Sequence, residues 1–145
     1  MRRRNFLKST SGALIGSAAL SNATAKSNIS ANDKVSIAMM GVRGRGTWLT
    51  RYFSALPEVN IPYICDVDPS VVGPATEVIE TKKGKTPKLV DDIRYVLDDQ
   101  SIDAVIIATP VFWHSAATIL ACEAGKDVYV EKPVSHNIRE GRLAV

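Results

Sequence analysis

Cysteine is scarce in this chain, and its two cysteines do not have the spacing of a metal or redox motif. Cys65 and Cys122 are the only two among 145 residues. Without a C-x-x-C pair the sequence does not indicate a zinc site or disulfide exchange, and no metal site is predicted. Cys65 ends an apolar run and Cys122 lies in an alanine-rich stretch. We therefore expect two buried thiols rather than a disulfide.

A membrane-length apolar run and a basic surface are missing as well. The apolar stretch at residues 13–20 is short and contains glycine and serine, whereas a helix needs about 20 apolar residues to span a bilayer. No stable membrane span is therefore expected. The net charge of +3 comes from residues 1–25, since the remainder holds 14 basic and 15 acidic residues. No basic stripe remains, so a nucleic-acid partner is not expected.

The first 25 residues contain the three regions of a secretory signal. Residues 2–4 are arginines, an apolar stretch follows, and residues 23–25 read Ala-Thr-Ala, a small-x-small cleavage site. Residues 3–8 read R-R-N-F-L-K, which resembles the twin-arginine export motif. We predict a twin-arginine signal peptide over residues 1–25, a linker over 26–33, passage through the twin-arginine export machinery and a periplasmic or exported location. An ordinary secretory signal is the alternative.

Short apolar runs alternate with helical patterns through the rest of the chain. We expect strands at residues 35–40, 61–66, 104–108 and 127–130. We expect helices at residues 45–56, 69–83, 91–97 and 114–124, and a last one capped by Asn137. This alternation predicts one α/β domain over residues 34–145, a doubly wound, Rossmann-like parallel sheet with helices on both faces. The basic residues 82–88 are expected to form a surface loop.

A glycine-rich segment follows the first expected strand. The dinucleotide fingerprint G-x-G-x-x-G, between a strand and a helix, aligns with Gly41, Arg43 and Gly46. Arg43 thus stands where a second glycine normally lets the backbone approach the pyrophosphate, although its guanidinium and that of Arg45 could bind phosphates. We predict cofactor binding by Gly41, Arg43, Gly44, Arg45 and Gly46. A glycine-rich turn without a ligand is the alternative.

An acidic residue ends the second expected strand. Asp66 lies 20 residues after Gly46, where a carboxylate can accept hydrogen bonds from the adenosine ribose hydroxyls. It would repel a 2′-phosphate, so NAD is predicted as the cofactor and NADP is less favoured. The alternative for Asp66 is a turn or cap acid, a role that Asp68 fits better.

Two further motifs follow the third and fourth expected strands. Residues 108–114 read A-T-P-V-F-W-H, and residues 125–133 read G-K-D-V-Y-V-E-K-P. In this order they resemble the Gfo/Idh/MocA family, which includes glucose–fructose oxidoreductase and inositol dehydrogenase. The resemblance covers residues 34–145. It implies a Rossmann domain followed by a larger α+β substrate domain, and we expect this second domain to be missing from the present chain.

The same resemblance implies hydride transfer between a nicotinamide and a carbon of a sugar or polyol. Lys132 would be the catalytic residue, placed beside the nicotinamide and the reacting hydroxyl, where the positive ring would favour its proton-accepting form. Glu131 would contact the nicotinamide ribose. Thr109, Pro110 and His114 would line the cofactor side of the crevice.

Three functions stay open at this point. The leading prediction is an exported NAD-dependent oxidoreductase acting on a sugar or polyol, which could form a homo-oligomer when full length. The second is an NAD-dependent glycoside hydrolase, since some relatives of the family are of this kind. The third is a non-catalytic dinucleotide-binding fragment. The resemblance also implies that Pro133 fixes the turn after the last strand, and in some family members its peptide bond is cis.

Overall fold

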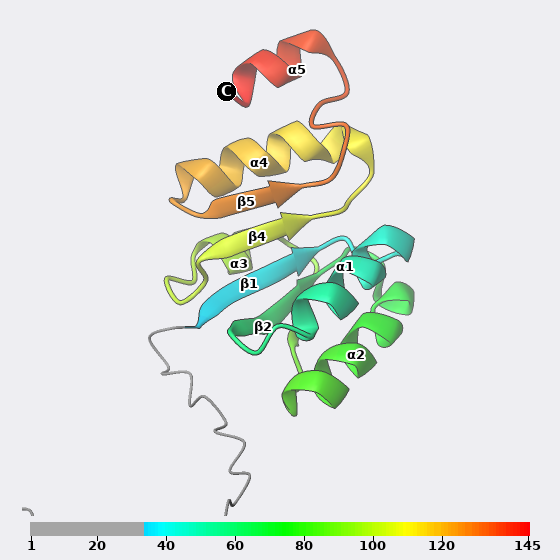
Figure 1. Cartoon of the computed structure of the whole chain (residues 1–145). Coiled ribbons are helices and arrows are strands. Elements are labelled where there is room, and N and C mark those ends of the chain that lie inside the picture. The colour runs from blue at the N-terminus through cyan, green and yellow to red at the C-terminus, as the bar shows by residue number, and fades with distance from the viewer. Residues whose placement is uncertain (1–33) are drawn as a thin grey trace, which may run out of the picture.

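The computed structural model describes residues 34–145, which form a five-stranded sheet between helices (Figure 1). The strands are β1 (Val35–Met40), β2 (Val59–Cys65), β3 (Lys88–Val90), β4 (Ala104–Ile107) and β5 (Asp127–Val130). All neighbours are parallel, in the order β3-β2-β1-β4-β5. The predicted doubly wound α/β fold is confirmed. The predicted signal peptide (1–25) and linker (26–33) lie outside the described residues.

The first strand lies at the centre of the sheet. Met39 of β1 lies opposite Ile64 of β2 on one side and Ile106 of β4 on the other. The chain runs outward from β1 to β3 and then crosses back to β4. In such sheets ligands bind beyond the carboxyl ends of the strands, where the strand order reverses. Here that place lies between the ends of β1 and β4.

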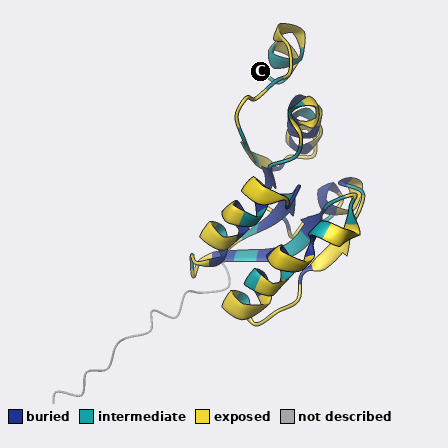
Figure 2. Ribbon diagram, turned by 90° about the vertical axis from the view of Figure 1, so that its right-hand side faces the viewer, coloured by how far each residue is buried: buried dark blue, intermediate teal, exposed yellow. Residues whose placement is uncertain are grey.

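Helices cover both faces of the sheet, and the sheet separates the hydrophobic core into two clusters (Figure 2). They are α1 (Gly44–Ser54) and α2 (Gly73–Lys83) on one face, and α3 (Arg94–Leu97) and α4 (His114–Glu123) on the other. Leu49 of α1 and Ile79 of α2 pack with Met39 in the first cluster. Val96 of α3 and Ala117 of α4 belong to the second. Burial on both faces explains why the inner strands are almost continuously apolar.

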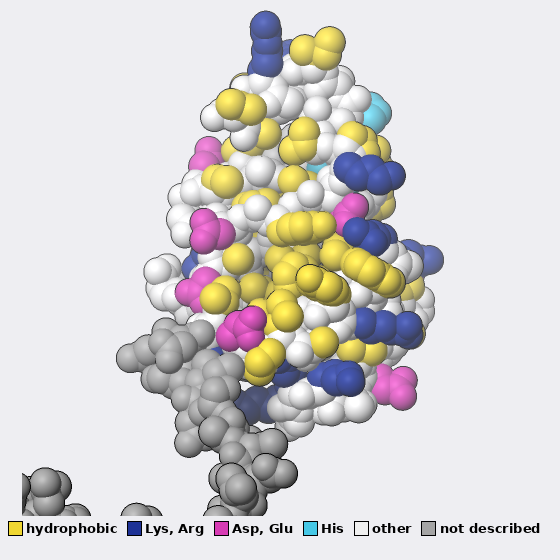
Figure 3. Space-filling view, in the orientation of Figure 1, with side chains coloured by type: hydrophobic (Ala, Val, Ile, Leu, Met, Phe, Trp, Pro, Cys, Tyr) yellow, Lys and Arg dark blue, Asp and Glu magenta, His cyan; other side chains and the backbone are white. Residues whose placement is uncertain are grey.

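Strand β5 carries no helix over its α1-side face within residues 34–145 (Figure 1). Tyr129 of β5 lies on this face, with its ring 6.0 Å from that of Phe53. Trp48 and Tyr52 of α1, both exposed, stack at 5.9 Å and extend the aromatic surface. Figure 3 shows an apolar patch in the middle of this face. Exposed apolar patches often mark contact with another chain or domain.

The structure contains one strand that the sequence did not predict. β3 pairs with residues 63–65 of β2 at the end of the expected surface loop. It has only three residues, two of them exposed, so it lacks the alternating pattern of a longer strand. The helix expected at residues 69–83 is also split, and a 3₁₀ turn, η3 (Pro69–Val71), precedes α2. Pro74 explains the break, because it is tolerated only in the first turn of a helix.

One burial prediction is wrong. Both cysteines are free, and Cys65 is buried as expected. Burial, helped by the nearby Asp66 carboxylate, raises the pKa of the Cys65 thiol to about 12. Cys122 is exposed, because the core-facing residue is its neighbour Ala121 and successive helical residues point about 100° apart. The sequence of this alanine-rich helix does not indicate which of its sides is buried, because alanine occurs on both.

Two helix ends are as predicted. Gly125 follows α4 with a left-handed φ of 72°, which suits a glycine at a helix end. The last helix, α5 (Ile138–Leu143), follows Asn137, whose side chain accepts a hydrogen bond from the Glu140 N–H at 3.0 Å. None of the helices within residues 34–145 is long and apolar enough to cross a membrane.

Candidate functional site

Four segments meet at the carboxyl edge of the sheet. Residues 41–46 follow β1, Asp66 follows β2, Thr109 and Pro110 follow β4, and residues 131–133 follow β5. Backbone hydrogen bonds join neighbouring segments at this edge: Gly41 to Cys65 at 2.9 Å, Ala108 to Met40 at 2.8 Å and Glu131 to Ile107 at 2.9 Å. The structure therefore brings together the segments in which the predicted site residues lie.

The first and third fingerprint glycines are required by close packing. Gly41 has a φ of 80°, and a Cβ on it would lie 2.8 Å from the backbone nitrogen of Thr109. A Cβ on Gly46 would lie 2.0 Å from the carbonyl oxygen of Gly41. The first turn of α1 thus rests directly on the end of β1, as a dinucleotide fingerprint demands.

The second fingerprint position does not need a glycine in this chain. Arg43 has an ordinary extended backbone, with φ of −69°, and forms the N-cap of α1. Its side chain leaves the loop and is 72% exposed. Gly44 supplies the positive φ, 30°, and a Cβ on it would meet nothing within 4 Å. The loop therefore keeps its shape with an arginine at the second position, because Gly44 makes the turn.

Asp66 is tied to the glycine loop by its side chain. Its Oδ2 accepts a hydrogen bond from the Val42 N–H at 2.9 Å, and its Oδ1 accepts one from the Asp68 N–H at 3.0 Å. A carboxylate has about four lone-pair sites, so each oxygen can accept another hydrogen bond. The carboxylate is half-buried at the end of β2 and faces the first residues of the loop.

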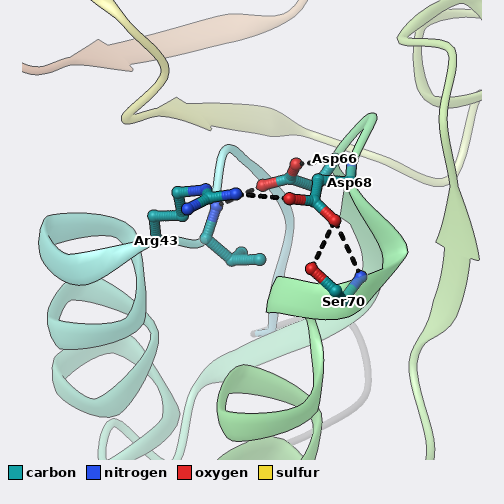
Figure 4. Close-up of polar contacts among 5 residues, drawn as sticks. Arg43, Asp66, Asp68 and Ser70 are labelled. Carbon is teal, nitrogen blue, oxygen red and sulfur yellow. Dashed lines mark hydrogen bonds and ion pairs between the residues drawn. The ribbon is translucent and has the colours of Figure 1, made fainter.

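Asp68 connects the turn after β2 to the arginine of the glycine loop (Figure 4). Its Oδ2 forms an ion pair with Arg43, and its Oδ1 accepts hydrogen bonds from the Ser70 N–H at 2.9 Å and the Ser70 hydroxyl at 2.6 Å. The hydrogen bonds from Ser70, with a further contribution from Arg43, lower the pKa of Asp68. Asp68 caps the turn as predicted, and Asp66 also has a turn role, because it accepts the Asp68 N–H two residues on.

A second ion pair joins α1 to the segment after β5. The Nε of Arg45 lies 2.7 Å from the Oε1 of Glu131. The Arg45 guanidinium also lies 4.3 Å from the centre of the Trp48 ring. The hydrogen bond from Arg45 lowers the pKa of Glu131. Each loop arginine is thus paired with a carboxylate of another segment at this edge.

His114 and Ser115, the first residues of α4, hold the segment after β5. The His114 ring is buried, with its Nδ1 2.7 Å from the Pro133 carbonyl oxygen and its Nε2 2.9 Å from the Thr109 carbonyl oxygen. The Ser115 hydroxyl donates to the Val134 carbonyl oxygen at 3.1 Å. Both ring nitrogens of His114 are engaged by backbone, so the ring supports the crevice from behind. Its predicted contact with a cofactor stays a prediction.

Lys132 stands in the middle of this anchored segment. Its side chain is exposed, and within residues 34–145 its ammonium makes no hydrogen bond or ion pair. The Lys132–Pro133 peptide bond is cis. Pro110 is exposed at the start of the 3₁₀ turn η4 (Val111–Trp113). The segment thus presents one free cation beside the ends of β4 and β5.

The pattern of these segments agrees with a known family. A family model described as oxidoreductase family, NAD-binding Rossmann fold, matches residues 35–145. The chain belongs to the Gfo/Idh/MocA family. It is 30% identical, over 97% of its length, to a glycosyl hydrolase family 109 protein from Shewanella pealeana. It is 34% identical, over 73% of its length, to an alpha-N-acetylgalactosaminidase from Shewanella oneidensis.

Solved structures resemble this Gfo/Idh/MocA domain as well. An NAD-binding protein from Listeria innocua matches 77% of this chain and 30% of its own at 29% identity, with a TM-score of 0.63. Scyllo-inositol dehydrogenase from Lactobacillus casei, solved with NAD(H) and scyllo-inositol, matches 77% of this chain and 32% of its own with a TM-score of 0.67. At 20% identity the second likeness shows the fold alone. The chain spans 35% of the S. pealeana relative and 24% of the S. oneidensis one.

The edge of this Gfo/Idh/MocA domain fits a dinucleotide. Gly41 and Gly46 keep the backbone bare at the N-terminus of α1, where free N–H groups and the helix dipole favour a phosphate. The buried hydroxyl of Thr109 at the end of β4 has no hydrogen-bond partner within residues 34–145, so its hydrogen-bonding capacity is left for a ligand at this edge. NAD, when bound here, would supply the hydride acceptor.

Sequence reasoning missed the partners of the predicted residues. Asp68 was assigned only a turn role, although it also pairs with Arg43. Ser115 carried no prediction, although it directly follows the histidine of the 108–114 motif. These contacts join residues far apart in the sequence, and no local pattern reports them.

Proposed function

We propose that this domain binds NAD between the glycine loop, Asp66 and residues 131–133. In the full-length protein, hydride would pass between the nicotinamide and a carbon of a sugar or polyol. The observation that carries the proposal is the contact between Gly41 and Gly46, where a Cβ on Gly46 would lie 2.0 Å from the Gly41 carbonyl oxygen. Such an approach of helix to strand is what the dinucleotide fingerprint provides. Family membership supports the assignment.

The adenosine half of the cofactor would occupy the β1–β2 side. The pyrophosphate would lie at the N-terminus of α1 with Arg45 at its flank, and Arg43 would lie on the side of the adenosine ribose. Asp66 keeps lone pairs on both carboxylate oxygens and would accept hydrogen bonds from the ribose hydroxyls. Because its charge repels a 2′-phosphate, NAD is favoured over NADP.

The reacting half would lie at the ends of β4 and β5. Lys132 would take the proton of the substrate hydroxyl, because its exposed amine is unengaged within residues 34–145 and a positive nicotinamide nearby destabilises the ammonium. Glu131 uses Oε1 for Arg45 and has Oε2 left for the nicotinamide ribose. Thr109 and Pro110 would line the crevice. His114 would hold Lys132 in place through the Pro133 carbonyl.

Hydrolysis of a glycosidic bond is the second candidate activity. The two Shewanella relatives named above, a glycosyl hydrolase family 109 protein and an alpha-N-acetylgalactosaminidase, favour it. In this reaction a sugar carbon would be oxidised transiently, the aglycone would leave by elimination, water would add to the resulting double bond, and the hydride would return to the carbonyl carbon. The two activities differ in outcome, since only the dehydrogenase accumulates NADH.

We also propose export through the twin-arginine pathway. Residues 1–25 support it by their arginine pair, apolar stretch and cleavage site. That pathway carries folded proteins, so NAD would be bound in the cytoplasm before transport. Replacing Arg3 and Arg4 with lysine should retain the protein in the cytoplasm, as measured by cell fractionation. Unchanged export would argue for an ordinary secretory signal.

The binding step is tested on the chain itself. Native mass spectrometry of the protein purified from cytoplasm without added cofactor should show a mass increase matching one NAD. Asp66→Ala should weaken NAD binding and relax the discrimination against NADP. An apo mass, with no binding on addition of NAD, would contradict the proposal.

The chemical step is tested by turnover. Lys132→Ala should keep NAD binding and lower turnover roughly a hundredfold or more, the scale of general acid–base catalysis. A panel of polyols and sugars followed by nicotinamide absorbance, together with release of nitrophenol from aryl glycosides, separates the two candidate activities. Full activity of the Lys132→Ala variant would remove Lys132 from the chemistry.

A further inference from the structure

We propose that Asp68 sets the cofactor preference of this site by neutralising Arg43, the cation that would otherwise bind the 2′-phosphate of NADP. The proposal rests on the proposed function, because it takes Asp66 to lie at the adenosine ribose. Its new element is a second acidic residue with a defined partner. Arg43 is then a residue of cofactor choice rather than a simple replacement of a glycine.

The three side chains lie together at one corner of the carboxyl edge of the sheet (Figure 4). Asp66 accepts a hydrogen bond from the backbone N–H of Asp68 at 3.0 Å, so both carboxylates belong to one turn. Arg43 reaches this turn from the glycine loop and pairs with the Asp68 carboxylate. The guanidinium therefore lies on the ribose side of the loop, and there it is already paired with the Asp68 carboxylate.

The charges at this corner favour NAD. Asp66 and Asp68 carry two negative charges and Arg43 carries one positive charge, which leaves a net charge of −1. A ribose 2′-hydroxyl can donate a hydrogen bond to a carboxylate, whereas a 2′-phosphate is repelled by it. An arginine released from Asp68 would offer several N–H donors to the phosphate, which is the partner that its planar fork matches best.

Asp68 uses its two oxygens for two separate tasks. Oδ1 accepts the Ser70 N–H at 2.9 Å and so caps η3. Oδ2 pairs with Arg43. Asparagine keeps a carbonyl oxygen for the cap and is among the best N-cap residues. Its amide group would replace Oδ2 with a second donor, which cannot hold the guanidinium. Asp68→Asn therefore removes the ion pair and leaves the turn intact.

The chain also offers a matched control. Asp92 has a similar arrangement: its Oδ1 accepts the Arg94 N–H at 2.9 Å, and both of its oxygens bond to the Arg94 guanidinium. The side chains of Asp68 and Asp92 are 34% and 31% exposed. Arg94 belongs to α3, on the face of the sheet opposite α1. Asp92→Asn thus makes the same change of charge without freeing an arginine of the glycine loop.

The test measures the dissociation constants of NAD and NADP by calorimetry at one low salt concentration. Asp68→Asn should tighten NADP binding by roughly tenfold, the effect of one unit charge close to a phosphate in solvent, and should change NAD binding by less than about threefold. Adding Arg43→Ala to that variant should abolish the gain. Asp92→Asn removes a charge at the same edge of the sheet but frees no arginine of the glycine loop, so it should shift NADP binding clearly less than Asp68→Asn does.

The outcomes separate this proposal from the one it rests on. Binding of NAD with no selective gain for NADP in Asp68→Asn, or a gain that persists without Arg43, would overturn the role of Asp68. A wild-type chain that binds neither cofactor would overturn the proposed function. Should Asp68→Asn unfold, Arg43→Ala alone decides: it changes the net charge of this corner from −1 to −2, so it should weaken NADP binding several-fold more than NAD binding. An unchanged ratio of the two constants would then reject the proposal.

Discussion

Gly46 offers the sharpest test of how the loop is built. Its hypothetical Cβ would lie 2.0 Å from the Gly41 carbonyl oxygen, whereas ordinary contact begins at 3.4 Å. Gly46→Ala must therefore move α1 away from the end of β1 by more than an ångström. The obstructing atom belongs to the backbone, so no rotamer change relieves the clash. We expect a loss of about 3 kcal/mol in the free energy of unfolding, the upper end of the cost of overpacking.

The assay is urea unfolding followed by circular dichroism, with thermal unfolding beside it. A loss of that size should lower the Tm by roughly 10 °C or more in a domain of this length. Displacement of α1 also distorts the phosphate cradle, so Gly46→Ala should bind NAD much more weakly even under conditions where it is folded.

Two other glycines separate steric clash from backbone preference. A Cβ on Gly44 or Gly73 would meet nothing within 4 Å, but Gly44 has a φ of 30° and Gly73 has no positive φ. Gly44→Ala should cost about 1 kcal/mol, the penalty of a left-handed conformation. Gly73→Ala, in the first turn of α2, should be neutral or stabilise by up to about 1 kcal/mol. If Gly46→Ala were no more damaging than Gly44→Ala, the close approach of helix to strand would be refuted.

Three further perturbations test other parts of the domain. His114→Phe should cost about 1–3 kcal/mol in the free energy of unfolding, because the neutral imidazole donates to one of the two carbonyl oxygens that face it, those of Thr109 and Pro133, whereas phenylalanine donates to neither. The hydrogen bond from Arg45 lowers the pKa of Glu131 in the folded state. The stability that this contact contributes is fully present above the pKa of an unfolded glutamate, about 4.3, and is lost as the pH falls through the lower folded pKa. Glu131→Gln should remove this part of the loss of stability at acid pH. A thiol reagent at neutral pH should label Cys122 and spare Cys65, which is buried and has a pKa of about 12.

Each of these measurements has its own control. Ser115→Ala removes a single hydrogen bond to the same segment and should cost about 1 kcal/mol, so a smaller cost for His114→Phe would contradict the anchoring of this segment by the His114 ring. Asp92→Asn removes an ion pair elsewhere and should leave the Glu131 contribution unchanged. Labelling of both thiols in the folded protein would show that Cys65 is accessible, and both should react in denaturant.

Local sequence patterns predicted the helices and strands that have a strong hydrophobic periodicity or clear capping residues at their ends. The strands at residues 35–40 and 127–130 have the predicted bounds. Asn137 caps the last helix, and Gly125 ends α4 with a positive φ. The edge strand β3 was missed, because three mostly exposed residues in a basic loop obtain their strand conformation from pairing with β2. The burial of Cys122 was mispredicted, because alanine marks neither side of a helix as the buried one.

The amino-acid sequence was sufficient for the alternation of strands and helices, the glycine loop and the acid after β2, because propensity, periodicity and turn chemistry are encoded within a few neighbouring residues. The pairing of Arg43 with Asp68, and the engagement of both His114 nitrogens by Thr109 and Pro133, became visible only in the folded chain. Apart from the His114–Thr109 contact, which spans five residues, those contacts depend on which strands become neighbours, and crossover connections bring together residues 19 and 25 positions apart. The helices and strands of this chain are therefore determined by local sequence, whereas the order of the strands in the sheet determines which partners most of its site residues contact.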